Sequence, residues 1–400
     1  MGNTRISTNG QYQFSLNLMM AKQRELAKTY QQVSTGSKMV TGADDPLGAG
    51  RSQQMDRSLA RLDQYGDNAT QLQSRLNQQE SVLAQAGDLL TRVRTLSVQA
   101  NNASLSDADR KSISNEFNTI YNQLLALSNS DDGSGRYLFG GTQDGNAPFT
   151  LSGGKVVYNG DQTQRQVEVA SGLRINDTLP GSEVFMRVRT GTGTVDTSVG
   201  AANTGTGLLL DFGITNSDTW NGATYNVVFT APDTYEVRDA SGGVLDSGRY
   251  SDGDTIAYGG IQMRLEGAPA AGDTFTIAPS GTRDIFSTLK ELASTLGTET
   301  TTDAQRAAQH NALQSGLRDI STAQQAFVDA RAEGGAGQSA IDNANDLNAS
   351  RTVATKTDLS SIRDLDYAEA LSRYSQESTA LDAAQRVFAQ IQQMSLFKQL

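Results

Sequence analysis

Hydrophobic residues near both ends of the chain recur at steps of three, four or seven, a spacing that gathers them on one face of a helix. In the last forty residues, 361–400, the recurring positions are Tyr367, Leu371, Tyr374, Leu381, Ala384, Phe388, Ile391 and Met394. Near the start they are Tyr12, Leu16, Met19, Gln23, Leu26, Tyr30 and Val33, which is typical of a coiled-coil seam. We call the set near the end the C-terminal stripe and the set near the start the N-terminal seam. Burial of the C-terminal stripe alone cannot offset the entropy lost when so long a segment becomes ordered. We therefore predict that the stripe needs a partner, and the N-terminal seam is the first candidate.

Two more helices are predicted behind the N-terminal seam. A loop over residues 34–50 contains Asp45-Pro46, and proline at the first position of a helix indicates a helix start. The second helix runs from about residue 47 to 103. Ser106-Asp107-Ala108-Asp109 is a capping-box pattern, and the apolar residues from Ile113 to Leu127 again step by four and three. The third helix is therefore expected to fold back on the second.

The middle of the chain, from Tyr137 to about Ser280, has the pattern of β-strands. Apolar residues alternate with polar ones in several short runs, such as Tyr225, Val227 and Phe229. Asn159-Gly160 and Asn221-Gly222 are short-turn signals. The glycine- and threonine-rich stretch 190–207 is of low complexity, and we expect it to be a mobile loop.

Helical spacing returns at Arg283. One short amphipathic helix is predicted over Ile285–Leu296, and a longer one begins after Asp303. Gly334, Gly335 and Gly337 should each weaken that helix by about 1 kcal/mol relative to alanine, and residues 341–361 continue in a helical pattern. The prediction is an α+β multidomain chain: long terminal helices form a coiled coil and helical bundle, and a mostly antiparallel β domain is inserted.

This pattern also suggests where the domains divide. We predict a terminal coiled-coil assembly domain from residues 1–45 with 355–400, and a helical rod domain from residues 46–145 with 283–354. The inserted β domain then spans residues 146–282. A chain that leaves and re-enters a helical bundle in this way brings its two ends together.

Composition excludes several classes of function. The net charge is −11, from 33 basic and 44 acidic residues, and the sequence has no dense run of lysine and arginine, so we expect no nucleic-acid partner. Without cysteine, disulfides and thiolate metal sites are impossible. The sequence contains no apolar run of eighteen residues and no pattern of a cleavable signal peptide, so we predict neither membrane insertion nor cleavage of a leader.

The chain offers little for catalysis. Its single histidine, His310, has no cysteine or second histidine to join it, so we interpret it as a partly buried interface residue. Asp44-Asp45 is expected to cap the loop and the start of the long helix. Asp252-Gly253-Asp254 lacks the rest of a calcium loop and is interpreted as a turn, and Trp220 as a residue of the β core. We predict no enzyme, no cofactor, no metal site and no catalytic residue.

Several stretches resemble a known family. The stretches from Val33 to Gly50 and from Leu96 to Leu127 are similar to the N-terminal region of the flagellin superfamily. Three others are similar to its hook-filament junction branch, the hook-associated protein 3 family: residues 44–49, residues 135–149 and residues 366–397. The resemblance covers about the first 150 and the last 120 residues, and it is loose in the β part.

The resemblance implies a structural adaptor that joins the bacterial flagellar hook, through hook-associated protein 1, to the flagellin filament. It implies a ring-like homo-oligomer, secretion through the flagellar type III apparatus to the extracellular flagellum, and an export chaperone that holds the C-terminal segment beforehand. The seam and stripe residues, Tyr12 to Val33 and Tyr367 to Met394, are then the candidate partner interface. The alternatives are a filament-forming flagellin, or a secreted flagellar protein whose β insertion binds a host or surface ligand.

Overall fold

The structure, a computed structural model, describes residues 8–102 and 104–396. The helices are α1 (Thr8–Thr35), α2 (Pro46–Ala100), α3 (Asp107–Ser128), α4 (Ile285–Gly297), α5 (Asp303–Arg363) and α6 (Tyr367–Leu396). The chain divides into two compact units. One comprises Met1–Asp67 with Ala344–Leu400, and the other Asn68–Asn343, so α2 and α5 belong in part to each. The three-domain division drawn from the sequence stays a prediction.

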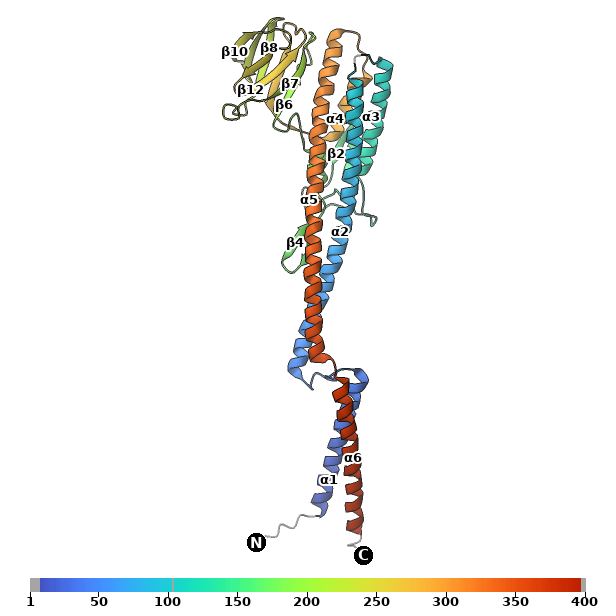
Figure 1. The fold of residues 1–400 in the computed structure, drawn as a ribbon. Coiled ribbons are helices and arrows are strands. Elements are labelled where there is room, and N and C mark those ends of the chain that lie inside the picture. The colour runs from blue at the N-terminus through green and yellow to red at the C-terminus, as the bar shows by residue number, and fades with distance from the viewer. Residues whose placement is uncertain (1–7, 103, 397–400) are drawn as a thin grey trace. The chain divides into compact units, whose positions relative to one another are not determined.

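In the first unit, the helices nearest the two ends of the sequence, α1 and α6, lie side by side (Figure 1). The predicted seam lies within α1 and the predicted stripe within α6. The predicted helix start at Pro46 is confirmed, because α2 begins at that residue.

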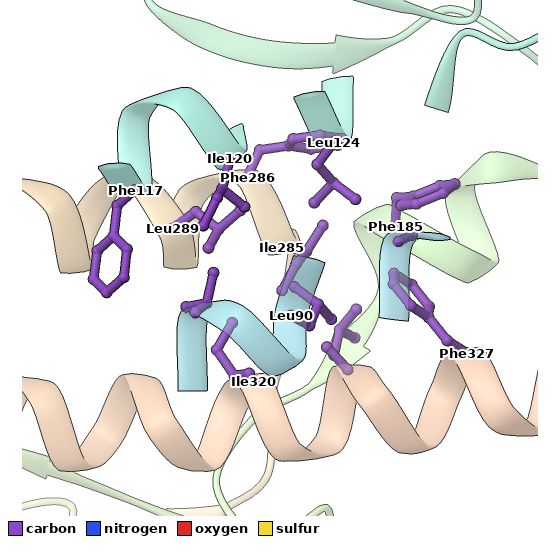
Figure 2. Close-up of a cluster of buried hydrophobic side chains, with 14 of the residues drawn as sticks. Leu90, Phe117, Ile120, Leu124, Phe185, Ile285, Phe286, Leu289, Ile320 and Phe327 are labelled. Carbon is purple, nitrogen blue, oxygen red and sulfur yellow. The ribbon is translucent and has the colours of Figure 1, made fainter. Parts of the chain in front are cut away.

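In the second unit, α2, α3, α4 and α5 surround one apolar core (Figure 2). Phe117 and Leu124 of α3, Leu289 of α4 and Leu90 of α2 are completely or almost completely buried there. Phe185 enters the same core from a short π-helical turn over Ser182–Met186, and its ring lies 5.5 Å from that of Phe327. The capping box is confirmed, because the Asp109 amide donates to Ser106 Oγ at 3.2 Å and the Ser106 amide donates to Asp109 Oδ2 at 3.3 Å.

The strands pair antiparallel, as predicted. A five-stranded sheet has the order β10-β9-β8-β13-β6, and a three-stranded sheet has the order β11-β12-β7. These strands are β6 (Val195–Val199), β7 (Leu208–Ile214), β8 (Tyr225–Ala231), β9 (Thr234–Asp239), β10 (Val244–Arg249), β11 (Thr255–Tyr258), β12 (Ile261–Glu266) and β13 (Thr274–Pro279). They enclose a second apolar core, separate from that of the helices. We call residues 190–281 the β module.

Six other strands of the described residues form two-stranded ribbons outside the β module. These are β1 (Phe149–Ser152) with β2 (Lys155–Tyr158), β3 (Gln166–Ala170) with β4 (Leu173–Asn176), and β5 (Val188–Arg189) with β14 (Thr282–Arg283). The last ribbon carries the chain into and out of the β module.

One prediction about the β part is wrong. Residues 190–207 are not a loop throughout, because β6 lies within them and pairs with β13, a strand too distant in sequence for local composition to reveal. The chain does bend at Asn221-Gly222, where the Ala223 amide donates to Asn221 Oδ1 at 3.1 Å, but neither this pair nor Asn159-Gly160 joins two paired strands. Gly153-Gly154 turns β1 into β2 and Gly259-Gly260 turns β11 into β12, each with positive φ at both residues, which glycine adopts without a steric penalty.

The glycines of α5 do not interrupt that helix. Gly334 is buried, and a Cβ at Gly337 would lie 3.2 Å from Leu76 Cδ1 of α2. At Gly337, the missing side chain therefore lets α2 approach α5 closely.

A buried ion network fixes the segment after α3 to α2. The Arg75 guanidinium lies 2.7 Å from Asp132 and 3.0 Å from Asp177, and all three side chains are at most 8% exposed. Arg165 continues the network, 2.6 Å from Asp177 and 3.1 Å from Asp144. Loss of Arg75 would therefore leave the buried Asp132 without its ion-pair partner, whereas Asp177 would keep Arg165.

Candidate functional site: the paired terminal helices

Two aromatic pairs set the register of α1 against α6. The ring centroids of Tyr12 and Phe388 are 5.3 Å apart, and those of Tyr30 and Tyr374 are 6.3 Å apart. The residue early in α1 thus meets the residue late in α6, so the two helices run antiparallel. The structure therefore brings the predicted N-terminal seam and C-terminal stripe together.

The pairing leaves much of this apolar surface open. The half-buried members are Leu16, Met19, Leu26, Val33, Tyr374, Leu381, Ala384 and Phe388. The exposed members are Tyr12 (37%), Tyr30 (62%), Tyr367 (53%) and Leu371 (54%). The side chains of Ile391 and Met394 lie outside the described residues. None of the predicted members whose side chains the structure describes is fully buried, so the helix pair leaves apolar surface open.

Sequence reasoning missed a second apolar face of α1. Phe14 is 69% exposed and Leu18 is 46% exposed. They are four residues apart, on a side of the helix away from the seam. Val387 of α6 is also 55% exposed. In the sequence, Phe14 and Leu18 are visible as an apolar pair at i and i+4, offset from the seam. Together with the seam, this pair gives α1 two apolar faces.

At one end of this helix pair, hydrogen bonds connect the loop that follows α1 with the turn that precedes α6. The Lys38 amide donates to the Arg363 carbonyl at 2.7 Å, and the Leu365 amide donates to the Gly36 carbonyl at 3.0 Å. Gly36 has φ +67, and a Cβ there would lie 2.7 Å from the Tyr367 hydroxyl oxygen. Only glycine combines this backbone conformation with that close approach. The loop after α1 is therefore bonded to the turn between α5 and α6.

The aspartate pair caps this loop, as predicted. Asp45 Oδ1 accepts a hydrogen bond from the Gly48 amide at 2.9 Å, at the start of α2. Asp44 Oδ2 accepts from the Thr41 amide at 2.8 Å, and Asp44 Oδ1 lies 2.8 Å from Lys28 Nζ of α1. The hydrogen bond from Lys28, followed by that from Thr41, lowers the pKa of Asp44 to about 2. The pair stabilises the loop and its contact with α1.

The other polar candidates lie elsewhere. His310 of α5 is half-buried, and burial lowers its pKa. Asp252 lies in a turn and accepts a hydrogen bond from the distant Gly267 amide at 2.6 Å. Trp220 packs against the β-module core, and its indole nitrogen donates to the Ala223 carbonyl at 3.1 Å. In the described part of the chain, no three histidine, cysteine or carboxylate residues cluster as metal ligands.

No helix of the described ranges combines the length and apolar character that crossing a bilayer requires.

Comparison with known proteins gives two family matches. The bacterial flagellin N-terminal helical region matches residues 6–144, and the bacterial flagellin C-terminal helical region matches residues 317–400. Flagellar hook-associated protein 3 of Escherichia coli strain K12 is 33% identical over 181 residues, which are 45% of this chain and 56% of the relative. Flagellin of Clostridium tyrobutyricum is 26% identical over 131 residues, 33% of this chain and 35% of the relative. The chain thus spans little more than half of the length of the E. coli relative.

Solved structures extend the similarity through the fold. The crystal structure of Xanthomonas campestris FlgL is 54% identical, and the match covers 76% of this chain and 99% of that one with a TM-score of 0.73. The crystal structure of flagellar hook-associated protein 3 from Legionella pneumophila is 27% identical, with 78% and 98% coverage and a TM-score of 0.74.

Proposed function

Because this chain belongs to the FlgL family, the flagellar hook-associated protein 3 branch of the flagellin superfamily, we propose that it is the structural adaptor between the flagellar hook and the flagellin filament. The observation that carries the proposal is the pair α1 and α6, which brings the first and last helices together yet leaves Tyr30, Leu371 and Phe14 exposed. Exposed apolar residues on paired helices favour burial against neighbouring subunits.

The adaptor has three kinds of neighbour in this proposal. Hook-associated protein 1 binds on the hook side, flagellin binds on the filament side, and copies of this chain lie beside one another in a ring. A repeated head-to-tail contact closes into a ring when its rotation allows. The two apolar faces of α1, one along the seam and one at Phe14 and Leu18, give each subunit separate surfaces for such contacts.

The same surface has a role before assembly. We propose that the chain leaves the cell through the flagellar type III apparatus and works in the extracellular flagellum. An export chaperone covers the C-terminal stripe until then, since Tyr367 and Leu371 would otherwise be exposed in the cytoplasm. The proposed role is mechanical and serves motility, without catalysis or cofactor.

Deletion of the gene from its own bacterium tests the proposal. Cells without this chain should build hooks, lack filaments and release flagellin into the medium, and the intact gene should restore filaments. Normal filaments in the deletion strain would contradict it. The runner-up is a filament-forming flagellin, and growth of long filaments from the purified chain alone at neutral pH would favour it.

A further inference from the structure

The β module is joined to the helical part by a narrow neck. The neck consists of β5 and β14, which are two residues each, with Val188 opposite Arg283 and Arg189 opposite Thr282. Val188 belongs to the core of the helices, whereas Val195 already belongs to the core of the β module. The two cores are thus separate, and the module lies beside α5 (Figure 1). Asn311 of α5 bonds the module directly, because its side chain accepts from the Leu209 amide and donates to the Gly207 carbonyl, each at 2.9 Å. The contacts between α5 and the neck add to this attachment at the point where the chain enters and leaves the module.

The Asp319 carboxylate of α5 contacts the chain both where it enters the β module and where it leaves it. Asp319 Oδ1 accepts a hydrogen bond from the Gly191 amide, just after β5, at 3.0 Å. Asp319 Oδ2 lies 3.5 Å from Arg283 Nη1 of β14. One turn further along α5, Thr322 Oγ1 donates to the Arg189 carbonyl at 2.5 Å. Asp319 is therefore the only one of these α5 residues that touches the incoming and the outgoing chain.

The negative charge of an ionised Asp319 carboxylate is poorly compensated by the groups around it. The residue is 3% exposed, and Oδ2 accepts no hydrogen bond. The charges that face it are Arg283 from β14, Arg318 from α5 and Asp196 from β6. Arg318 places its guanidinium 4.8 Å over the Phe212 ring instead of on Asp319, and Asp196 repels it. A buried carboxylate in this setting is more favourable when it is protonated.

We propose that Asp319 is a latch: its neutral form holds the neck of the β module firmly on α5, and its ionised form loosens the attachment. When the neck opens, water hydrates the ionised carboxylate again and stabilises the open state. The neutral acid is stabilised less by hydration. The Gly191 hydrogen bond survives protonation, since one carboxyl oxygen remains an acceptor.

The direction of the pH effect follows from the two states of the latch. Burial, opposed by the Gly191 hydrogen bond and by Arg283, raises the pKa of Asp319 to about 6 with the neck closed, whereas a solvated aspartate has a pKa of about 3.9. A raised pKa means that the closed state binds the proton more tightly, so closure is most favourable below about pH 4. It weakens as pH rises towards and through 6.

Hydrogen exchange of the intact chain tests this inference. Protection factors of the Gly191 and Thr190 amides, corrected for the intrinsic exchange rate, are measured from pH 5 to 8. The Thr190 amide donates instead to the Gly281 carbonyl at 3.2 Å, directly beside the neck, so its protection reports the opening of the neck. We expect the protection of both amides to fall about tenfold between pH 5 and 8. Constant protection in the natural chain would overturn the proposal, whether or not any variant folds.

Two variants test whether the pH dependence comes from the Asp319 carboxylate. Asp319→Asn keeps an acceptor for Gly191 without the charge, so Thr190 should be more protected than in the natural chain at pH 8, with no dependence on pH. Asp329→Asn removes an exposed carboxylate of the same helix and should behave like the natural chain. An unchanged pH dependence in Asp319→Asn would overturn the latch.

Discussion

Tyr12 and Phe388, which lie near opposite ends of the sequence, place their ring centroids 5.3 Å apart. This contact lies at the far end of the antiparallel pair from Tyr30 and Tyr374. Phe388 is nevertheless only half-buried, and Tyr12 remains 37% exposed. The contact aligns the two helices without completing a core, which leaves apolar surface open for the proposed contacts with neighbouring subunits.

Replacement of Phe388 by aspartate should prevent assembly while the β module stays folded. The change removes an aromatic pair that contributes about 0.5–1.5 kcal/mol. It also places an unpaired charge on the C-terminal stripe. Leu381→Asp should act in the same way. The control is Gln385→Asp, which adds the same charge at an exposed position of α6. Electron microscopy of flagella and swimming assays measure the result, and a motile, assembled Phe388→Asp strain would count against the account.

Replacement of Gly36 by alanine should destabilise the connection between α1 and α6. The left-handed backbone at φ +67 costs about 1–2 kcal/mol with a Cβ, and that atom would also clash with the Tyr367 hydroxyl. Gly10→Ala is the matched control, because Gly10 lies in α1 with no atom near its missing Cβ. Protease resistance of residues 30–45 should fall only in Gly36→Ala, and equal resistance in both variants would refute this role of Gly36.

Replacement of Arg75 by methionine should be strongly destabilising. It leaves the buried carboxylates of Asp132 and Asp177 without their shared cation, and such changes cost about 3–5 kcal/mol. Arg92→Met removes an exposed ion pair with Glu116 and should cost about 1 kcal/mol or less. Urea unfolding followed by circular dichroism compares them, and similar midpoints would show that the network contributes little.

The same network should make the second unit sensitive to acid. Burial raises the pKa of Asp132, but the hydrogen bonds from Ser134 and Arg75 outweigh it and lower the pKa to about 2. A lowered pKa contributes stability that is complete above about pH 4, the range of a solvated aspartate, and is lost as pH falls towards 2. The urea midpoint of the natural chain should therefore fall over this range, and Asp132→Asn should lose less. Parallel curves would contradict this assignment.

The sequence predicts those parts of the fold that rest on local spacing. The α1 seam, the α6 stripe, the Ser106 capping box and the start of α2 all have signals within a few residues. The edge strand β6 has no such signal, because its partner β13 lies about eighty residues away. Asp319 was missed for a similar reason. A polar residue beside the buried Ile320 suggests a solvated position, and only the folded chain brings Gly191 and Arg283 to it.

The adaptor role is tested most directly with hooks isolated from a strain that lacks this chain but retains hook-associated protein 1. Purified chain is added to the hooks, flagellin monomers follow, and filaments attached to hooks are counted by electron microscopy. Filaments are expected only on hooks that received the chain, and none are expected with the Phe388→Asp variant. Equal filament growth on hooks without the chain would contradict it.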